Sequence, residues 1–472
     1  EQKIAAPKIT PIVTNRDSQS EFLSEIQTSQ VQPIEPVFVD YKKDMSQFEA
    51  QPGIDVLYKK NETNDIFTLI YVFNTGTEND PALNLAFNYL SYLGTDKMTA
   101  EEIASEMYDI ACSFYMNAGA NQSSIQITGL SENMGKAMEI VEGLIAGAKP
   151  DEAILENCKA DMLKSRADAK LNQSRCFGAL QRYLFYGGDF IRRTTLTDPA
   201  LQALTSEQLL AKIGDLTGKQ HEVLYYGPQK EAEVKSALAK HHKVAADLQP
   251  LEKKFSALLP TDANKVVLAQ YDAKQLYYLQ FSNRGEKFDV AADPEITLYN
   301  EYFGGGMNTI VFQEMREARG LAYTAWATLA TPSNANGDYS YYAFIATQND
   351  KMQKAAEAFD DIINNMPESE KAFGIAKEAL VSRLRTERTV KDGVLWSYLR
   401  ARDLGLDAPR DKQIFEKVQS MTLDDVKAAQ QKWVKGRKYV YGILGDIQDL
   451  DLNYLKTLGP IQTVSQEEIF GY

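Results

Sequence analysis

The second half of the chain repeats the first, and this duplication is the feature that most constrains the fold. When the sequence is shifted along itself by 218 residues (352 − 134 = 218), identical residues coincide through a region of helical periodicity. The coinciding pairs are Met134/Met352, Lys136/Lys354, Ala137/Ala355, Ile145/Ile363, Lys159/Lys377, Arg182/Arg400 and Gly187/Gly405. Chance supplies isolated identities at one offset, but it does not reproduce the order of predicted elements over a whole half. The sequence therefore predicts two homologous domains.

The predicted elements within each half indicate the fold class. Segments 54–58 and 66–73 are β-prone and flank a polar turn at 60–64, and the end of each half, 204–227 and 421–445, combines a helical pattern with a strand. Strands and helices are grouped and do not alternate as regular βαβ units. We therefore predict an α+β fold in which each domain is an antiparallel sheet packed on one face by helices.

Composition shifts suggest the domain boundaries. Residues 1–50 contain Pro7, Pro11, Pro33 and Pro36 among polar residues and are interpreted as a linker or arm. The first domain is predicted to span 51–245 and the second 255–472, with a charged connection near 240–262. A length of 472 residues accommodates two such domains.

The charge balance narrows the classes of partner. Lys and Arg number 51 and Asp and Glu 65, so the net charge is 51 − 65 = −14. A chain of this charge repels phosphate backbones, which excludes nucleic acid and favours basic or neutral peptides. No apolar run is long enough to span a bilayer. The chain starts without Met, which we interpret as a trimmed signal, with export to the periplasm, or as a cut from a longer protein; the compartment cannot be read from this end.

The sequence offers little support for a metal site or a reactive thiol. None of the histidines has H-E-x-x-H or H-x-x-E-H spacing, and the adjacent pair inside Lys-His-His-Lys is interpreted as a solvated charged loop. A carboxylate-only site for magnesium or calcium stays formally open, although acidic pairs are more typical of exposed helix faces. The odd cysteine count indicates buried thiols and no disulfide framework. The residues concerned are His221, His241, His242, Cys112, Cys158, Cys176, Asp360 and Asp361.

Residues 304–329 combine a glycine run, an amphipathic helix, an Arg-Gly stop and an aromatic strand. The glycines lack the Lys-Ser/Thr of a phosphate loop, which argues against phosphate binding. Arg316 and Tyr323 flank the tight junction at Gly320. The two side chains can donate together to one carbonyl or oxyanion. The alternative is a helix Arg that complements the dipole beside an ordinary strand Tyr.

The segment NTIVFQEMREARGLAYTAWA resembles the second-domain signature of the pitrilysin/insulinase family of zinc metallopeptidases, including the Arg-x6-Tyr spacing of Arg316 and Tyr323. The first half is similar to the family as well, through FNTGTEND and LNLAFNYLSYLGTDKMTAEEIASEMYDIACSFYMNAG. When the two are aligned on Gly94-Thr95, the family's zinc histidines and catalytic glutamate fall on Leu85, Tyr89 and Asn88. All three positions are replaced.

The resemblance implies a zinc-free half of such a peptidase, inactive alone, that completes a peptide chamber for a zinc-bearing half. It implies no cofactor in this chain and zinc on the partner, which is either a separate subunit or an upstream part of the same chain. Arg316 and Tyr323 would then hold the substrate carbonyl, and the peptide would bind as an added edge strand. Two alternatives stay open, namely a non-catalytic structural or assembly subunit of the same fold and a free-standing peptide-binding module.

Overall fold

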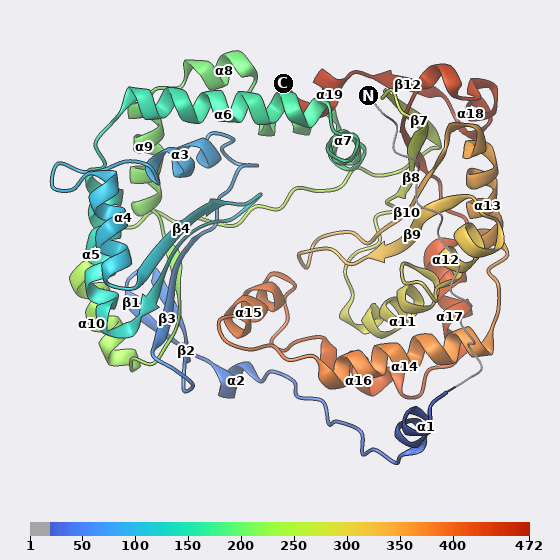
Figure 1. Cartoon of the computed structure of the whole chain (residues 1–472), viewed down its shortest axis with the longest axis horizontal. Helices are drawn as coiled ribbons and strands as arrows, with labels where there is room; N and C mark the ends of the chain where they lie inside the picture. The colour runs from blue at the N-terminus through green and yellow to red at the C-terminus, as the bar shows by residue number, and fades with distance from the viewer. Residues whose placement is uncertain (1–18) are drawn as a thin grey trace, which may run out of the picture.

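The computed structural model describes residues 19–472 and contains two six-stranded sheets that face each other across the molecule (Figure 1). The strand order is β1-β2-β6-β3-β5-β4 in the first sheet and β12-β7-β11-β8-β10-β9 in the second. The first sheet consists of β1 (Ser46–Gln51), β2 (Ile54–Lys60), β3 (Ile66–Phe73), β4 (Cys112–Ala118), β5 (Ser123–Leu130) and β6 (His221–Gly227). The second consists of β7 (Lys265–Gln270), β8 (Gln275–Ser282), β9 (Ala322–Ala330), β10 (Ser340–Gln348), β11 (Val440–Gly445) and β12 (Ile461–Val464).

Helices cover the outer face of each sheet, away from the middle of the molecule (Figure 1). Apolar residues of these helices and of the outer sheet faces form one large buried cluster per domain. The first domain contains α3 (Leu83–Leu90), α4 (Ala100–Asp109), α5 (Met134–Gly147), α6 (Glu152–Lys170), α7 (Gln173–Thr194), α8 (Asp198–Ala203), α9 (Ser206–Thr217) and α10 (Glu231–His241). The second contains α11 (Asp293–Phe303), α12 (Ile310–Phe312), α13 (Met352–Asn364), α14 (Glu370–Thr386), α15 (Gly393–Asp403), α16 (Asp411–Val418), α17 (Leu423–Ala429), α18 (Leu452–Leu458) and α19 (Gln466–Phe470). The predicted α+β class with two homologous domains is confirmed.

The sheets differ from the sequence-based description in one respect, because each contains parallel pairing. β6 lies between β2 and β3 and pairs parallel with β2. In the second sheet, β11 lies between β7 and β8 and pairs parallel with β7. Segments 54–58 and 66–73, which flank the polar turn, are therefore not hydrogen-bonded neighbours. A strand from the far end of each half fills the gap, and local sequence patterns carry no information about such a long-range insertion.

The structure also locates the point where the repeat changes register. Helices α5 and α13 begin 218 residues apart (352 − 134 = 218), whereas α3 and α11 begin 210 apart (293 − 83 = 210). The change falls at the β9–β10 hairpin, whose connection covers 331–339 where the first domain uses 119–122. The single offset of 218 therefore aligns the halves only downstream of this hairpin.

The two domains exchange one helix each. Helix α7 of the first domain packs on the inner face of the second sheet, where Leu180 and Leu184 lie in one cluster with Leu279 and Phe344. A Cβ atom at Gly442 would lie 2.3 Å from Leu184 Cδ1, so the absence of a side chain there lets helix and strand approach closely.

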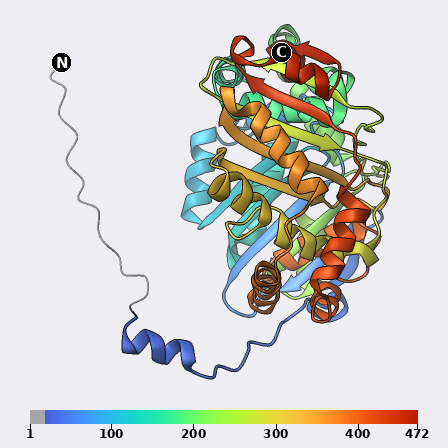
Figure 2. The ribbon, with the colours of Figure 1, turned by 90° about the vertical axis from the view of Figure 1, so that its right-hand side faces the viewer.

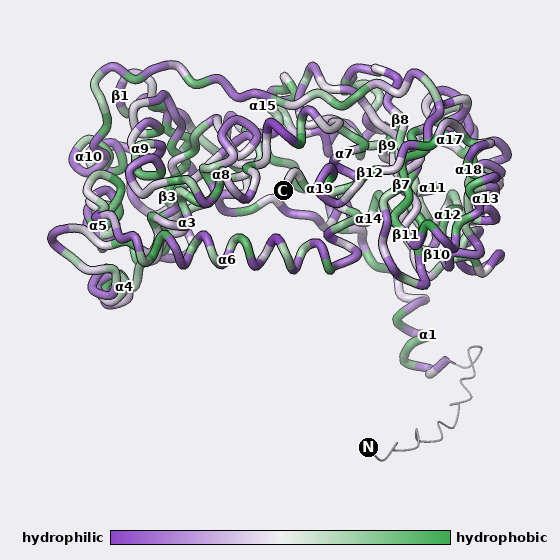
Figure 3. The backbone as a smooth tube through the Cα atoms, turned by 90° about the horizontal axis from the view of Figure 1, so that it is seen from above, coloured by the Kyte–Doolittle hydropathy of each residue, from purple (hydrophilic) through white to green (hydrophobic). Residues whose placement is uncertain are grey.

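Helix α15, the repeat equivalent of α7, packs in return on the inner face of the first sheet. Leu395 and Leu399 lie in one buried cluster with Ile70 and Leu224. The reciprocal packing ties the two domains into one body, and Figure 3 shows α6 running from the first domain toward the second. A glycine of positive φ occupies matching positions in the two repeats. Gly187 has a φ of +82° at a kink inside α7, and Gly405 has a φ of +71° just after the end of α15.

The N-terminal segment runs along the outside of the molecule. Helix α1 (Glu21–Thr28) has no buried residue and stands away from the body (Figure 2). Further on, Arg385 donates to the Ile34 carbonyl at 3.0 Å, and α2 (Tyr41–Asp44) leads into β1, which falls at the end of the predicted arm. The first 18 residues of that arm lie outside the described residues. Within residues 19–472, no helix is both long and apolar enough to cross a membrane.

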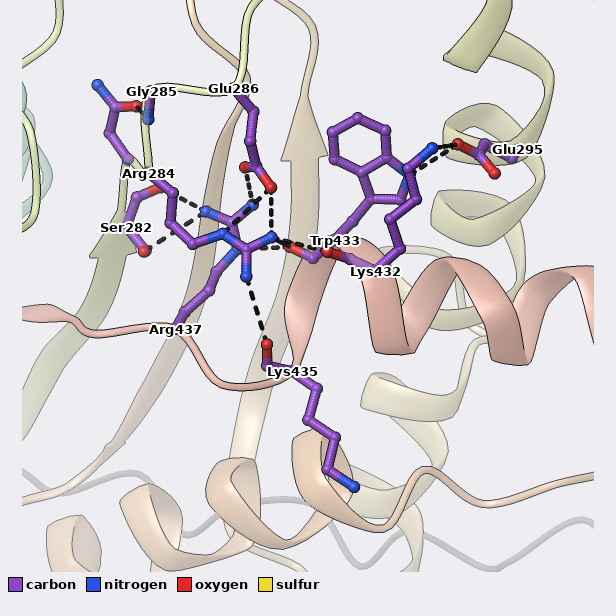
Figure 4. Close-up of polar contacts among 10 residues, drawn as sticks. Ser282, Arg284, Gly285, Glu286, Glu295, Lys432, Trp433, Lys435 and Arg437 are labelled. Carbon is purple, nitrogen blue, oxygen red and sulfur yellow. Dashed lines mark hydrogen bonds and ion pairs between the residues drawn. The ribbon is translucent and has the colours of Figure 1, made fainter.

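A buried guanidinium anchors the end of the second domain (Figure 4). Arg437 donates to Glu286 at 2.6 Å and to the Trp433 carbonyl at 2.5 Å, and its side chain is fully buried. The network joins the end of β8, the start of β11 and the helical turn Gln430–Val434. The carboxylate offsets the cost of burying the charge, which is the usual arrangement for a structural buried arginine.

Candidate functional site

The glycine run after α11 brings the backbone against strand β9. The Gly304 carbonyl accepts a hydrogen bond from the Ala327 N–H at 3.1 Å. A Cβ atom at Gly304 would lie 2.6 Å from the Ala327 carbonyl oxygen, which leaves no room for a side chain. The backbone at Gly304 therefore lies directly against β9, which fixes the turn against the sheet.

A short helix follows and carries Arg316. It begins as α12 and continues as a π-helix over Gln313–Ala318, with Val311 and Met315 fully buried against the core. Gly320 has a φ of +58°, a conformation that glycine adopts without strain, and the chain turns there into β9. Rigid elements thus hold both sides of the junction. π-helical turns are frequent at functional sites.

The guanidinium of Arg316 lies between two aromatic rings. Its Cζ is 5.0 Å from the centre of the Phe312 ring and 4.7 Å from that of Tyr323. Its Nη1 lies 3.5 Å from the Tyr323 carbonyl oxygen and its Nε 3.5 Å from Glu317 Oε1. Stacking on the rings orients the planar guanidinium without engaging most of its five donors. The structure therefore brings Arg316 and Tyr323 into direct contact.

Tyr323 lies at the start of β9, the edge strand of the second sheet, and its side chain is 75% exposed. Further along the free edge of β9, the Asn300 side chain hydrogen-bonds both the N–H and the carbonyl of Leu329. The Gly304 carbonyl accepts the N–H of Ala327 on the same edge. Because such groups alternate along a strand, those of Ala325 point to the same edge, and no hydrogen bond from outside the sheet reaches them among residues 19–472. The open part of the edge lies beside Tyr323.

The positions aligned with the zinc motif do not fit a metal. Leu85 and Tyr89 on α3 are fully buried in the core of the first domain. The Tyr89 hydroxyl lies 2.8 Å from Ser206 Oγ and accepts the Asp151 N–H at 2.9 Å, while Asn88 is exposed. Leu85 and Tyr89 are core residues, and the Tyr89 hydroxyl is hydrogen-bonded to neighbouring groups, so the residues at these three positions do not fit a zinc site.

Replacing Tyr89 by Phe should lower the free energy of unfolding by about 1–3 kcal/mol, because the buried Ser206 hydroxyl loses its partner and the Asp151 N–H at the start of α6 loses its acceptor. Chemical denaturation measures the change. Tyr92→Phe is the matched control, since Tyr92 is 57% exposed, and it should change stability by less than about 0.5 kcal/mol. Equal effects of the two substitutions would show that the Tyr89 hydroxyl has no structural role.

The other candidate metal ligands and the cysteine thiols also offer no reactive site in the part of the chain that the structure describes. Among residues 19–472, no group of three or more His, Cys, Asp or Glu side chains is arranged to hold a metal ion. All three cysteines are free and buried, as expected from sequence, and burial raises the pKa of each thiol. A thiol of raised pKa carries little thiolate at neutral pH and is a poor nucleophile.

The interpretation of His241-His242 as a solvated loop is wrong for His242. This residue directly follows α10, and its ring is buried, where its Nδ1 lies 2.5 Å from Glu142 Oε1 and its Nε2 lies 2.8 Å from Nε2 of His221. Both histidines and Glu142 are buried. The ring is satisfied by partners that lie 21 and 100 residues away in the sequence, which explains why the local charge pattern was misleading.

A cleft in the first domain is lined by two arginines that the sequence did not indicate as site residues. Thr77, Asn84, Ala118, Arg166, Arg182 and Thr195 are among its lining residues. The repeat comparison pairs Arg182 with Arg400, which was the only sequence signal for any of them. Helix α15, which carries Arg400, packs on the other sheet, so the pairing said nothing about a cleft.

The described residues thus combine a duplicated α+β fold with an arginine and a tyrosine that lie together at a free sheet edge. Residues 216–380 match the family described as "Peptidase M16 inactive domain". An uncharacterized zinc protease of Rickettsia bellii is 24% identical over 63% of this chain and 70% of its own length. Residues 216–380 are therefore similar to the inactive domain of this family, and the chain as a whole has zinc proteases among its relatives.

Solved structures show the same fold. The peptidase M16 inactive domain from Pseudomonas fluorescens superposes with a TM-score of 0.67 at 18% identity and covers 85% of this chain and 98% of its own. The periplasmic protease PqqL from Escherichia coli superposes with a TM-score of 0.65 at 14% identity over 94% of this chain. This chain spans only 49% of the PqqL chain.

Proposed function

We propose that this chain is the zinc-free half of an M16-type metalloendopeptidase, which closes a peptide chamber and orients the scissile peptide for a zinc-bearing half. The observation that carries the proposal is the stack of Arg316 on Tyr323, with Cζ 4.7 Å from the ring centre, at the open part of a sheet edge. A guanidinium and a phenol preorganised in this way can donate to one carbonyl oxygen as negative charge develops on it.

The free edge of β9 supports peptide binding by the same residues. An extended peptide adds to an exposed edge through main-chain hydrogen bonds, which gives affinity with loose side-chain specificity. Added beside Ala325, its carbonyl groups would lie near the Tyr323 hydroxyl and the free donors of Arg316. The match to about half of PqqL supports a partner half, whether separate or joined in the same chain. That neighbour is periplasmic, and export is part of the proposal.

Peptide hydrolysis measured with and without a zinc-bearing half tests the proposal. A fluorogenic peptide should stay intact with this chain alone, and cleavage by a partner carrying H-x-x-E-H should rise when this chain is added. A chelator should abolish the combined activity, because the metal belongs to the partner. Chelator-sensitive hydrolysis by this chain alone would overturn the proposal.

A further inference from the structure

A cleft of 430 Å³ opens in the first domain, away from Arg316 and Tyr323. It lies between the start of α3, the β4–β5 turn and the helices α6 and α7. Two arginines line it, Arg166 from α6 and Arg182 from α7. The run Ala118-Gly119-Ala120 also lines it, and the carbonyls of Gly119 and Ala120 accept the N–H groups of Thr77 and Glu78.

Arg182 is a partly buried guanidinium without an acidic partner. Its Nη2 donates to Thr194 Oγ1 at 2.7 Å, and its Cζ lies 5.0 Å from the centre of the Phe190 ring. Among residues 19–472, no carboxylate oxygen lies within 4.0 Å of its nitrogens, and burial lowers its pKa. The buried Arg437 of Figure 4, by contrast, is held by Glu286 at 2.6 Å. Glu78 lies beyond this distance and still raises the pKa of Arg182, so it acts on the guanidinium only at longer range. The hydrogen-bond donors of Arg182 that do not face Thr194 are therefore open to a ligand or to solvent.

Arg166 makes the same side of the cleft cationic. Its side chain is 13% exposed, pairs with Asp198 at 2.6 Å and stacks on the Tyr472 ring at 4.3 Å. One carboxylate uses only part of a guanidinium's five donors. Glu78 also lines the cleft, but its Oε2 accepts a hydrogen bond from Ser256 at 2.5 Å and lies more than 4.0 Å from both guanidinium groups.

Strand β4 gives the cleft a second binding element, because it is the free edge strand of the first sheet. The Gly119 N–H bonds the Gln122 carbonyl across the hairpin, so by alternation the main-chain groups of Ala118 point to the open edge. A peptide that followed this edge would reach the α6–α7 side of the cleft. Arginine is the side chain best suited to hold a carboxylate there, through two parallel N–H···O bonds.

We propose that this cleft binds a carboxylate of a peptide, with Arg182 as its principal donor and Arg166 as the second. The inference rests on the proposed function, since it assumes that peptides enter the chamber, and it adds a preference for an acidic group. An Asp or Glu side chain and a free C-terminus present the same chemistry to the two guanidinium groups.

Fluorescence anisotropy with labelled peptides and the full chain tests this site. Three peptides that differ only in their carboxylates are compared. The first has an internal Glu and an amidated C-terminus, the second has Gln in its place and an amidated C-terminus, and the third has Gln and a free C-terminus. At least one carboxylate peptide should bind about tenfold or more tighter than the Gln amide, and the preferred one identifies the source of the carboxylate. Equal affinity of all three, or no binding, overturns the inference.

Variants connect the preference to the cleft. Arg182→Gln should remove the tenfold preference, and Asn84→Glu, at an exposed position lining the cleft, should do the same by repulsion without removing any packed group. Arg192→Gln is the matched control, because Arg192 lies on the same helix with its side chain 72% exposed, and it should keep the preference. Thermal unfolding checks that the variants are folded. A preference that survives both cleft variants overturns the inference, while the cleavage assay with the partner half judges the proposed function separately.

Discussion

Substitution of Tyr323 by Phe, or of Arg316 by Gln, is expected to lower peptide turnover of the reconstituted two-half enzyme by about 10²–10³-fold, the usual cost of removing one donor from an oxyanion site. Each change removes hydrogen-bond donors and leaves the fold intact, because Tyr323 is 75% exposed and Arg316 contacts only its two rings, Glu317 and one carbonyl. The loss should appear in kcat as well as in kcat/KM, since the donors act as charge develops. Steady-state hydrolysis of a fluorogenic peptide measures both.

Matched substitutions separate a role in turnover from general damage. Arg319→Gln removes a neighbouring arginine that pairs with Asp361 at 2.7 Å, and Tyr108→Phe changes an 84% exposed tyrosine on α4. Both should leave turnover within about twofold, because surface pairs contribute about 0–1 kcal/mol. If the Arg316/Tyr323 double variant kept full turnover, the chain would be a structural or assembly subunit in which this pair only packs.

The sequence predicted most of the fold because the duplication is recorded in residues that share a helix face. Met134 and Met352 begin matching helices α5 and α13, and both are buried. Gly187 and Gly405 match because both hold a positive φ at the end of an exchanged helix segment. Residues of this kind are constrained locally, so their spacing survives as a readable pattern.

Long-range contacts were not predictable in the same way. The insertion of β6 between β2 and β3 and the exchange of α7 and α15 bring together residues more than a hundred positions apart. The pair of Arg316 and Tyr323 was predictable because the two lie only seven positions apart (323 − 316 = 7), on either side of one glycine turn. Arg166 and Arg182 lie on two different helices. The sequence of each helix does not indicate which of its faces lines a cleft, so this pair could not be predicted.

The buried histidine pair predicts how stability depends on pH. Burial, with a smaller contribution from His242, lowers the pKa of His221 from 6.5 to about 4. Its Nδ1 lies 2.8 Å from the Lys219 carbonyl and therefore carries the proton, so the bare Nε2 faces His242 at 2.8 Å. Protonation of His221 would place a second hydrogen between the two rings. Folding therefore requires the neutral form of His221.

The unfolded chain binds a proton at His221 below about pH 6.5, whereas the folded chain does so only below about pH 4. The free energy of unfolding should thus fall as the pH drops through this window, by about 3 kcal/mol from this residue, since one pKa unit corresponds to about 1.4 kcal/mol. Chemical denaturation of wild type and His221→Gln at pH 7, 5.5 and 4 isolates the contribution, because the carboxylates titrate in both proteins.

The His221→Gln variant should be the less stable protein at pH 7, where it loses a buried hydrogen-bonded ring, and the gap should close by about 3 kcal/mol at pH 4. His241→Gln serves as the control, because His241 lies one residue before His242 but is only partly buried, and it should leave most of the pH dependence in place. A constant gap between wild type and His221→Gln from pH 7 to 4 would mean that the folded protein binds this proton as readily as the unfolded chain. Since the tautomer set by Lys219 leaves no acceptor for it, that result would require the two histidine rings to separate at low pH.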